Sequence, residues 1–206
     1  MGEHNWGYAY SLKEGDVVIE VGAYTGDDVA AFSQAVGITG RVILIEPNPA
    51  LFIALRNAAA LDTYNNVTLV FKAVYSSNGL VSFTGGAHEQ GHLSYVPPFR
   101  GQSDEGRPVF DVEAITLDTL ASTLGLAVIN LLVMDVEGAE MDVFVGAYEL
   151  FKKGVIKNIA TAAYHQAGDI ERFEALLRLR GFNKFVVDEK NSNNTPDMPV
   201  LHASLE

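Results

Sequence analysis

The chain of 206 residues contains no cysteine and few cationic residues. Without cysteine, neither a disulfide framework nor a thiolate metal site can form. Lysine and arginine together number 14, against 26 aspartates and glutamates, so the formal net charge is −12. Because nucleic acid is bound mainly through Lys and Arg that face phosphates, this balance predicts that nucleic acid is not a partner.

Long apolar runs and targeting segments are also missing. The longest apolar run, around residues 126–134, is far shorter than a membrane span. The first five residues are too polar for a signal peptide. We therefore expect no membrane partner and a cytoplasmic location. With 48% apolar residues and interspersed charges, the chain is expected to form one globular domain over residues 1–206, and nothing in it indicates an oligomeric state.

Apolar strand-like runs alternate with helix-like segments along the chain, which predicts an α/β fold with a mostly parallel sheet covered by helices on both faces. Strands are expected at residues 16–21, 41–45, 67–71, 128–134, 156–164, 182–187 and 199–204. Helices are expected at residues 28–36, 49–61 and 169–180, with another ending near residue 153. Residues 73–79 are rich in turn-forming residues.

Residues 85–108 interrupt this alternation. The segment is rich in Gly, Pro, Ser, Gln and charge, and it is too long for a simple connection in a compact domain. Segments of this kind are usually functional lids or disordered loops. We expect it to act as a mobile lid over a substrate site.

A glycine turn, Glu20-Val21-Gly22-Ala23-Tyr24-Thr25-Gly26, follows the first strand. A dinucleotide site would need Gly-x-Gly-x-x-Gly, but Tyr24 and Asp27 occupy its second and third glycine positions. A phenol ring would fill the pyrophosphate space, and a carboxylate would stand where phosphate prefers to bind. The turn instead suits a cofactor with a cationic end and no phosphate, such as S-adenosylmethionine. The alternative is an ordinary turn whose acids favour the helix dipole.

Two further acids follow predicted strands. Glu46, in Glu46-Pro47-Asn48, lies about two dozen residues past the turn, where a carboxylate can accept both ribose hydroxyls of an adenosine cofactor. Asp135 ends the strand 128–134 and is expected in the same crevice. It could orient the methionyl amine, take a proton from an acceptor, or hold a hard cation.

The residues near Asp135 predict which group acts as the general base and whether the reaction needs a metal ion. His165 follows a strand and is the best-placed imidazole for general-base work, although a strand-end histidine can equally be bonded to backbone. Gly138 directly follows Glu137, so we expect the chain to turn and send Glu137 away from Asp135. We therefore predict metal-independent methyl transfer, with Asp135 or His165 as the base and no metal ligands.

These motifs together resemble the FkbM-type S-adenosylmethionine-dependent methyltransferase family. The resemblance is carried by VIEVGAYTG (residues 18–26), EPNP (46–49), NV (66–67), AV (73–74), Gly79, TLD (116–118), DVEGAE (135–140) and Gly146. It implies a class I, Rossmann-like methyltransferase fold with a seven-stranded sheet, and O-methylation of a hydroxyl on a small molecule or sugar. Two positions depart from the family pattern: Val133 stands where a lysine is frequent, and Ala163 where a glutamate is common.

The resemblance also implies where the cofactor binds. It places Gly22, Glu46 and Asp135 at the S-adenosylmethionine site. With them we expect the remaining residues of the three motifs and one adjacent pair: Glu20, Ala23, Tyr24, Gly26, Pro47, Asn48, Ala73 and Val74.

Two other functions are weighed against this one. His88-Glu89-Gln90-Gly91-His92 matches the zinc-hydrolase pattern His-Glu-x-x-His, but that pattern requires a helix, and the glycines around it disfavour one. The chain could also be an S-adenosylmethionine-binding module without catalysis. An oxidoreductase is contradicted by Tyr24 and Asp27 in the glycine turn.

Overall fold

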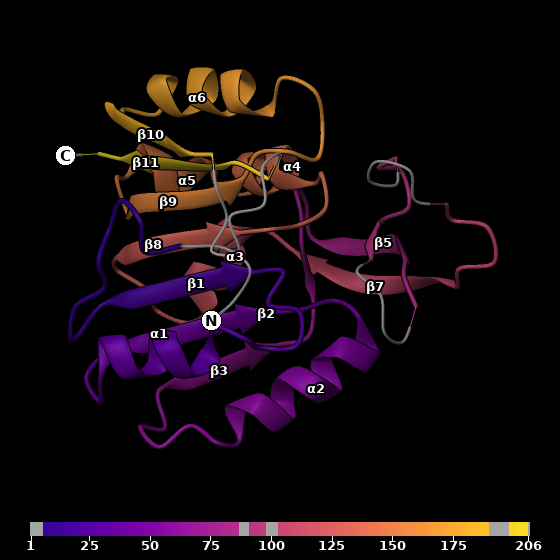
Figure 1. Cartoon of the computed structure of the whole chain (residues 1–206), viewed down its shortest axis with the longest axis horizontal. Coiled ribbons are helices and arrows are strands. Elements are labelled where there is room, and N and C mark those ends of the chain that lie inside the picture. The colour runs from indigo at the N-terminus through magenta and orange to yellow at the C-terminus, as the bar shows by residue number, and fades with distance from the viewer. Residues whose placement is uncertain (1–5, 87–90, 98–102, 190–197, 206) are drawn as a thin grey trace.

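A seven-stranded sheet runs through the centre of the protein (Figure 1). The computed structural model describes residues 6–86, 91–97, 103–189 and 198–205. The sheet has the order β3-β2-β1-β8-β9-β11-β10, and β11 is the only one of these seven strands that runs opposite to the others. Its strands are β1 (Val17–Val21), β2 (Arg41–Ile45), β3 (Val67–Val70), β8 (Ile129–Met134), β9 (Ile156–Ala162), β10 (Lys184–Asp188) and β11 (Val200–Ser204). The predicted mostly parallel, seven-stranded sheet is confirmed.

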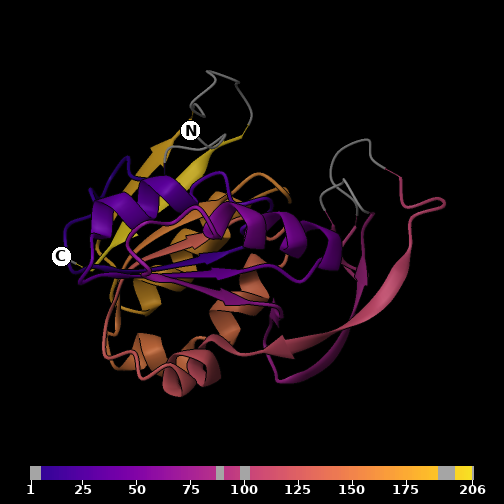
Figure 2. The same ribbon diagram turned by 90° about the horizontal axis from the view of Figure 1, so that it is seen from below.

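Helices cover both faces of this sheet because its strands alternate between two apolar clusters. Val18 packs with residues of α1 (Val29–Val36) and α2 (Pro49–Ala59). Ile19 and Val21 face the opposite cluster, to which the other helices contribute. These are α3 (Leu117–Thr123), α4 (Glu140–Val145), α5 (Tyr148–Lys152) and α6 (Asp169–Leu179). Figure 2 shows α1 and α2 on one side of the sheet. None of the described helices is long and apolar enough to cross a membrane.

A second, four-stranded sheet stands beside the first and was not predicted (Figure 1). Its order is β4-β7-β5-β6, with β4 (Ala73–Val74), β5 (Gly79–Thr84), β6 (His92–Leu93) and β7 (Val109–Ile115). The turn-rich interpretation of residues 73–79 is therefore wrong for Ala73, Val74 and Gly79. The strands β5 and β7 each have three exposed positions and lack the continuous apolar runs that marked the central strands.

The expected lid contributes to this second sheet. Residues 87–90 and 98–102 of that segment lie outside the described part. Within the described part, Leu93 and Val96 are buried with Phe83, Ala114 and Ala139. This portion of the segment thus packs against the protein, and its mobility stays a prediction.

The expected single helix after Asp135 is divided into α4 and α5. Gly146 ends α4, and its backbone lies so close to Tyr75 that a Cβ atom at position 146 would meet the Tyr75 carbonyl oxygen at 2.2 Å. The carbonyl of Gly146 also accepts a hydrogen bond from the Asp118 N–H. The break in the helix therefore lies at a tight contact with the segment that follows β4.

This contact predicts a selective loss of stability. Gly146→Ala should lower the free energy of unfolding by about 1–3 kcal/mol, because the added methyl group overpacks against backbone that cannot rotate away. Urea unfolding of the purified variant measures this loss. Gly7→Ala is the matched control, since a Cβ at position 7 meets only the Tyr10 carbonyl oxygen, at 3.8 Å, and should change stability by no more than about 0.5 kcal/mol. Equal effects of the two substitutions would contradict the assignment.

Candidate functional site

The carboxyl ends of β1, β2 and β8 meet at a cavity that is partly open to solvent. This is where ligands bind in open parallel sheets. The cavity wall includes most of the residues predicted to hold the cofactor: Gly22, Tyr24, Glu46, Pro47, Ala73, Val74 and Asp135. The second sheet contributes Phe83 and Leu93, so the cavity lies between the two sheets.

The glycine turn after β1 is packed tightly against β2 and β8. Gly22 has φ +85, and a Cβ atom there would lie 1.9 Å from the Asp135 carbonyl oxygen. The N–H groups of Gly22 and Ala23 both donate to the Ile45 carbonyl at 3.0 Å. Only glycine fits at position 22. The cavity wall at this position therefore consists of backbone atoms.

Glu46 is a buried carboxylate held by the backbone around it. Its Oε2 accepts the N–H of Tyr24 at 3.0 Å, and its Oε1 accepts the N–H of Asn48 at 2.8 Å. Burial raises the pKa of Glu46 to about 7, although these two hydrogen bonds act to lower it. Each oxygen keeps a second lone pair with which it could accept a hydroxyl group.

Four of the predicted cofactor residues support the cavity without lining it. Asn48 caps α2 through the Ala50 N–H and donates from Nδ2 to the Gly86 carbonyl. A Cβ at Gly26 would meet Leu55 and Val29, so this glycine allows the turn to pack on α1 and α2. Glu20 and Ala23 are buried. Burial, followed by the charges of Asp28 and Asp135, raises the pKa of Glu20 well above its usual range.

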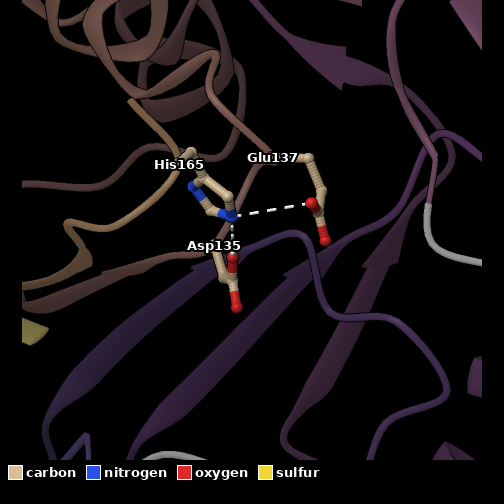
Figure 3. Close-up of side chains that lie close together, drawn as sticks. All are labelled: Asp135, Glu137 and His165. Carbon is tan, nitrogen blue, oxygen red and sulfur yellow. Dashed lines mark ion pairs between the residues drawn. The ribbon is translucent and has the colours of Figure 1, made fainter. Parts of the chain in front are cut away.

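A cluster of acids around one imidazole adjoins the cavity (Figure 3). His165 Nε2 lies 3.3 Å from Asp135 Oδ1 and 3.5 Å from Glu137 Oε2, while Nδ1 lies 2.9 Å from Glu140 Oε1. The hydroxyl of Tyr164 donates to Asp135 Oδ2 at 3.1 Å. The structure therefore brings together Asp135 and His165, the two predicted catalytic residues.

The predicted orientation of Glu137 is wrong. Glu137 was expected to point away from Asp135, but both carboxylates face the same imidazole nitrogen (Figure 3). Glu137 itself adopts the left-handed conformation, with φ 54, and Gly138 follows with φ 97. Two successive positive φ angles tighten the turn, and the Glu137 side chain stays beside Asp135 and lines the cavity.

The charged groups of the cluster change one another's pKa values. Burial lowers the pKa of His165, but the charges of Glu140, Asp135 and Glu137 outweigh burial and raise this pKa to about 9. Burial, together with Asp135, raises the pKa of Glu137 to about 7. Burial and Asp135 also raise the pKa of Tyr164 above its usual range. The cluster therefore favours any positive charge placed inside it.

Several residues of the site were not predicted from the sequence. Lys72 and Phe83 line the cavity, and Lys72 forms an ion pair with Glu113. Lys72 precedes Ala73, and Phe83 lies in β5. Neither could be placed at the cavity without knowing that the second sheet forms. Glu140 was named only as part of the motif of residues 135–140, and its contact with His165 was not predicted.

The zinc-hydrolase motif receives no support from its described residue. His88 and Glu89 lie outside the described residues, whereas His92 lies in strand β6 rather than on a helix. Its Nδ1 lies 3.0 Å from the Leu93 carbonyl and its Nε2 lies 3.0 Å from Asp104 Oδ1. Both imidazole nitrogens thus already have protein partners.

The fold is that of class I S-adenosylmethionine-dependent methyltransferases. A fibrillarin from Aeropyrum pernix, solved with bound S-adenosyl-L-methionine, superposes with a TM-score of 0.57 at 14% identity, covering 96% of this chain and 70% of that one. A fibrillarin pre-rRNA processing protein of Methanococcus jannaschii gives a TM-score of 0.55 at 15% identity, covering 95% and 69%. At these identities the likeness shows the fold alone, and the exclusion of nucleic acid stays a prediction.

Sequence comparison identifies the family. The model of the methyltransferase FkbM domain matches residues 20–184, so the chain belongs to the FkbM methyltransferase family. A curated relative, the 2-O-methyltransferase NoeI of Sinorhizobium fredii, is 30% identical over 179 residues, which are 82% of this chain and 70% of that protein. The predicted resemblance is confirmed.

The raised pKa of Glu46 predicts that cofactor binding depends on pH. If the ionised carboxylate accepts the ribose hydroxyls, a proton must leave Glu46 on binding whenever the pH is below about 7. The dissociation constant for S-adenosylmethionine should therefore rise as pH falls through 7, approaching about tenfold per pH unit, and level off above about pH 8. Isothermal titration across this range measures it.

Glu46→Gln is the matched control, because it keeps the shape but does not titrate. It should bind more weakly and show a flatter pH profile than the wild type. The control retains the other groups that titrate nearby, including Glu137, and the ligand's own amine. Identical profiles for the two proteins would assign the pH dependence to a group other than Glu46.

Proposed function

We propose that this protein methylates a hydroxyl oxygen of a small molecule or sugar, using S-adenosylmethionine as the methyl donor. The observation that carries the proposal is the cavity at the ends of β1, β2 and β8, which joins a ribose-binding carboxylate to an acid that can act on an acceptor. The family assignment and the name of the 2-O-methyltransferase relative support the same reaction.

The residues present fit S-adenosylmethionine. The backbone of Gly22 forms part of the cavity wall, and Glu46 offers two carboxylate oxygens to ribose hydroxyls. Apolar side chains such as Pro47, Val74 and Phe83 provide a wall suited to adenine. The acidic surroundings of Asp135 suit a cationic group. When bound, the cofactor supplies an electrophilic methyl group.

The chain's own contribution is to position the acceptor and to remove its proton. As the acceptor oxygen bonds to the methyl carbon, its proton must pass to a base. We assign this role first to Asp135, because its carboxylate lines the cavity. His165 contacts Asp135 Oδ1 from behind, and its side chain is only 3% exposed. In this arrangement His165 holds the carboxylate and is the second candidate for the base.

Replacing Glu46 tests the cofactor assignment. Glu46→Ala should weaken S-adenosylmethionine binding by about 1.5–3 kcal/mol, the usual range for hydrogen bonds to a charged group. The measurement is isothermal titration with the purified variant, after circular dichroism has shown that it is folded. A folded variant with an unchanged dissociation constant would overturn the ribose assignment.

Replacing Asp135 tests the catalytic assignment. Asp135→Asn keeps the side-chain shape and the contact with Tyr164 but removes the charge. Methyl transfer should fall by about 10²–10⁴-fold, the usual contribution of a positioned base, whereas the melting temperature should change little. The assay follows labelled methyl transfer to a panel of hydroxylated small molecules and sugars.

Asp111→Asn is the control, because Asp111 is exposed on β7 and bonded only to Ser82 among the described contacts. It should retain wild-type activity. Cofactor binding by the wild type, with no transfer to any acceptor in the panel, would favour the alternative of a binding module without catalysis.

A further inference from the structure

We propose that Asp135, Glu137 and His165 together bind one divalent transition-metal cation, Mn²⁺ or Zn²⁺, beside the cofactor cavity (Figure 3). One ligand atom from each residue lies within 4.8 Å of the other two. Metal-independent transfer was predicted in part because Glu137 was expected to turn away from Asp135. The structure contradicts that expectation, so this part of the reasoning against a cation no longer holds.

The distances from the His165 imidazole to the two carboxylates fit a shared ion. His165 Nε2 is 3.3 Å from Asp135 Oδ1 and 3.5 Å from Glu137 Oε2. Charge-assisted hydrogen bonds are shorter, at about 2.7–2.9 Å. Ligands bound to one ion by bonds of about 2.0–2.2 Å are separated by about 2.8–3.6 Å at octahedral to tetrahedral angles. Both distances fall within that range.

Glu140 orients the imidazole toward the proposed ion. His165 Nδ1 lies 2.9 Å from Glu140 Oε1, and that oxygen also accepts the N–H groups of Val136 and Gly138. Metal-binding histidines usually donate their other ring N–H to a carboxylate in this way. Glu140 is almost fully buried, and its contact with Nδ1 leaves Nε2 directed toward Asp135 and Glu137.

The formal charge of the cluster favours a dication. Asp135, Glu137 and Glu140 contribute −3 around a single imidazole. A proton on the ring reduces this to −2, whereas a dication with a neutral ring reduces it to −1. Buried charges without compensation are costly, so a dication balances the cluster better than a proton does.

The ligand types and the accessibility of the site indicate which cation would bind there and what it would do in catalysis. A nitrogen ligand with two carboxylates suits Mn²⁺ or Zn²⁺ better than Ca²⁺ or Mg²⁺, which prefer oxygen. Asp135 and Glu137 line the cavity, so further coordination positions would face an incoming ligand. Three protein ligands with an open position are typical of catalytic sites. If the proposed O-methylation is correct, the cation would bind the acceptor hydroxyl and lower its pKa, so that the hydroxyl proton passes to solvent through the open side of the cavity. Asp135 would then be a ligand rather than the base.

Metal binding can be measured without cofactor or acceptor. The metal proposal can therefore fail or succeed independently of the proposed methyl transfer. The full chain is treated with EDTA, desalted, and titrated with MnCl₂ and with ZnCl₂ by calorimetry, with Mn²⁺ binding also followed by electron paramagnetic resonance. We expect one equivalent of at least one of the two metals to bind. The absence of saturable binding up to millimolar metal would overturn the proposal.

Variants locate the site. Glu137→Gln and His165→Gln should each weaken binding by at least about tenfold, and Glu140→Gln by about 10–100-fold through the imidazole. Asp111→Asn should bind as the wild type does, and circular dichroism of every variant checks folding. If folded Glu137→Gln and His165→Gln bind the metal as tightly as the wild type, the site lies elsewhere and the proposal fails. Methyl transfer that is unchanged after metal removal would overturn the catalytic consequence.

Discussion

The close contact between Gly22 and the Asp135 carbonyl is the constraint on which the site depends. It forces the turn after β1 against the end of β8, while the N–H groups of Gly22 and Ala23 tie the same turn to the end of β2. The N–H of Asp135 in turn donates to the Val21 carbonyl. Three strand ends are therefore held at fixed separations, and the acids that follow β2 and β8 must face one cavity. A side chain at position 22 would separate the strands before it affected any ligand.

Negative charge gathers where these strand ends meet. Glu20, Glu46, Asp135, Glu137 and Glu140 all lie in or beside the cavity, and several have raised pKa values because burial disfavours their ionised forms. The net acidity of the chain could be attributed to solubility alone, but Glu20, Glu46 and Glu140 are buried and Asp135 and Glu137 are partly buried. Their burial is unfavourable unless a positive group balances it. A cationic cofactor and a metal ion are both ligands that such a cavity stabilises.

The sequence predicts the central sheet because buried parallel strands are continuous apolar runs, and it predicts Gly22, Glu46 and Asp135 because each directly follows such a run. The second sheet could not be predicted in this way, since β5 and β7 each have three exposed positions and no continuous apolar run. Lys72 and Phe83 were missed with it. The position of Glu137 depended on a left-handed backbone at a non-glycine residue. No local pattern indicates that conformation, because the surrounding contacts determine it.

The two departures from the family pattern bear on the same charge balance. Val133 stands where a lysine is frequent, two residues before Asp135, and it is buried in the apolar cluster beneath α1. Residues two apart on a strand share a face, so a lysine there could offer a positive charge on the side of the sheet where Glu20 lies. This chain has an aliphatic residue instead. Ala163, directly after β9, likewise stands where an acid is common, so this chain lacks an acid between β9 and His165. The positive charge that balances the Asp135 and Glu137 carboxylates must therefore lie on the His165 side of the cavity. There, Glu140 holds the imidazole, and a bound cation would neutralise more of the negative charge.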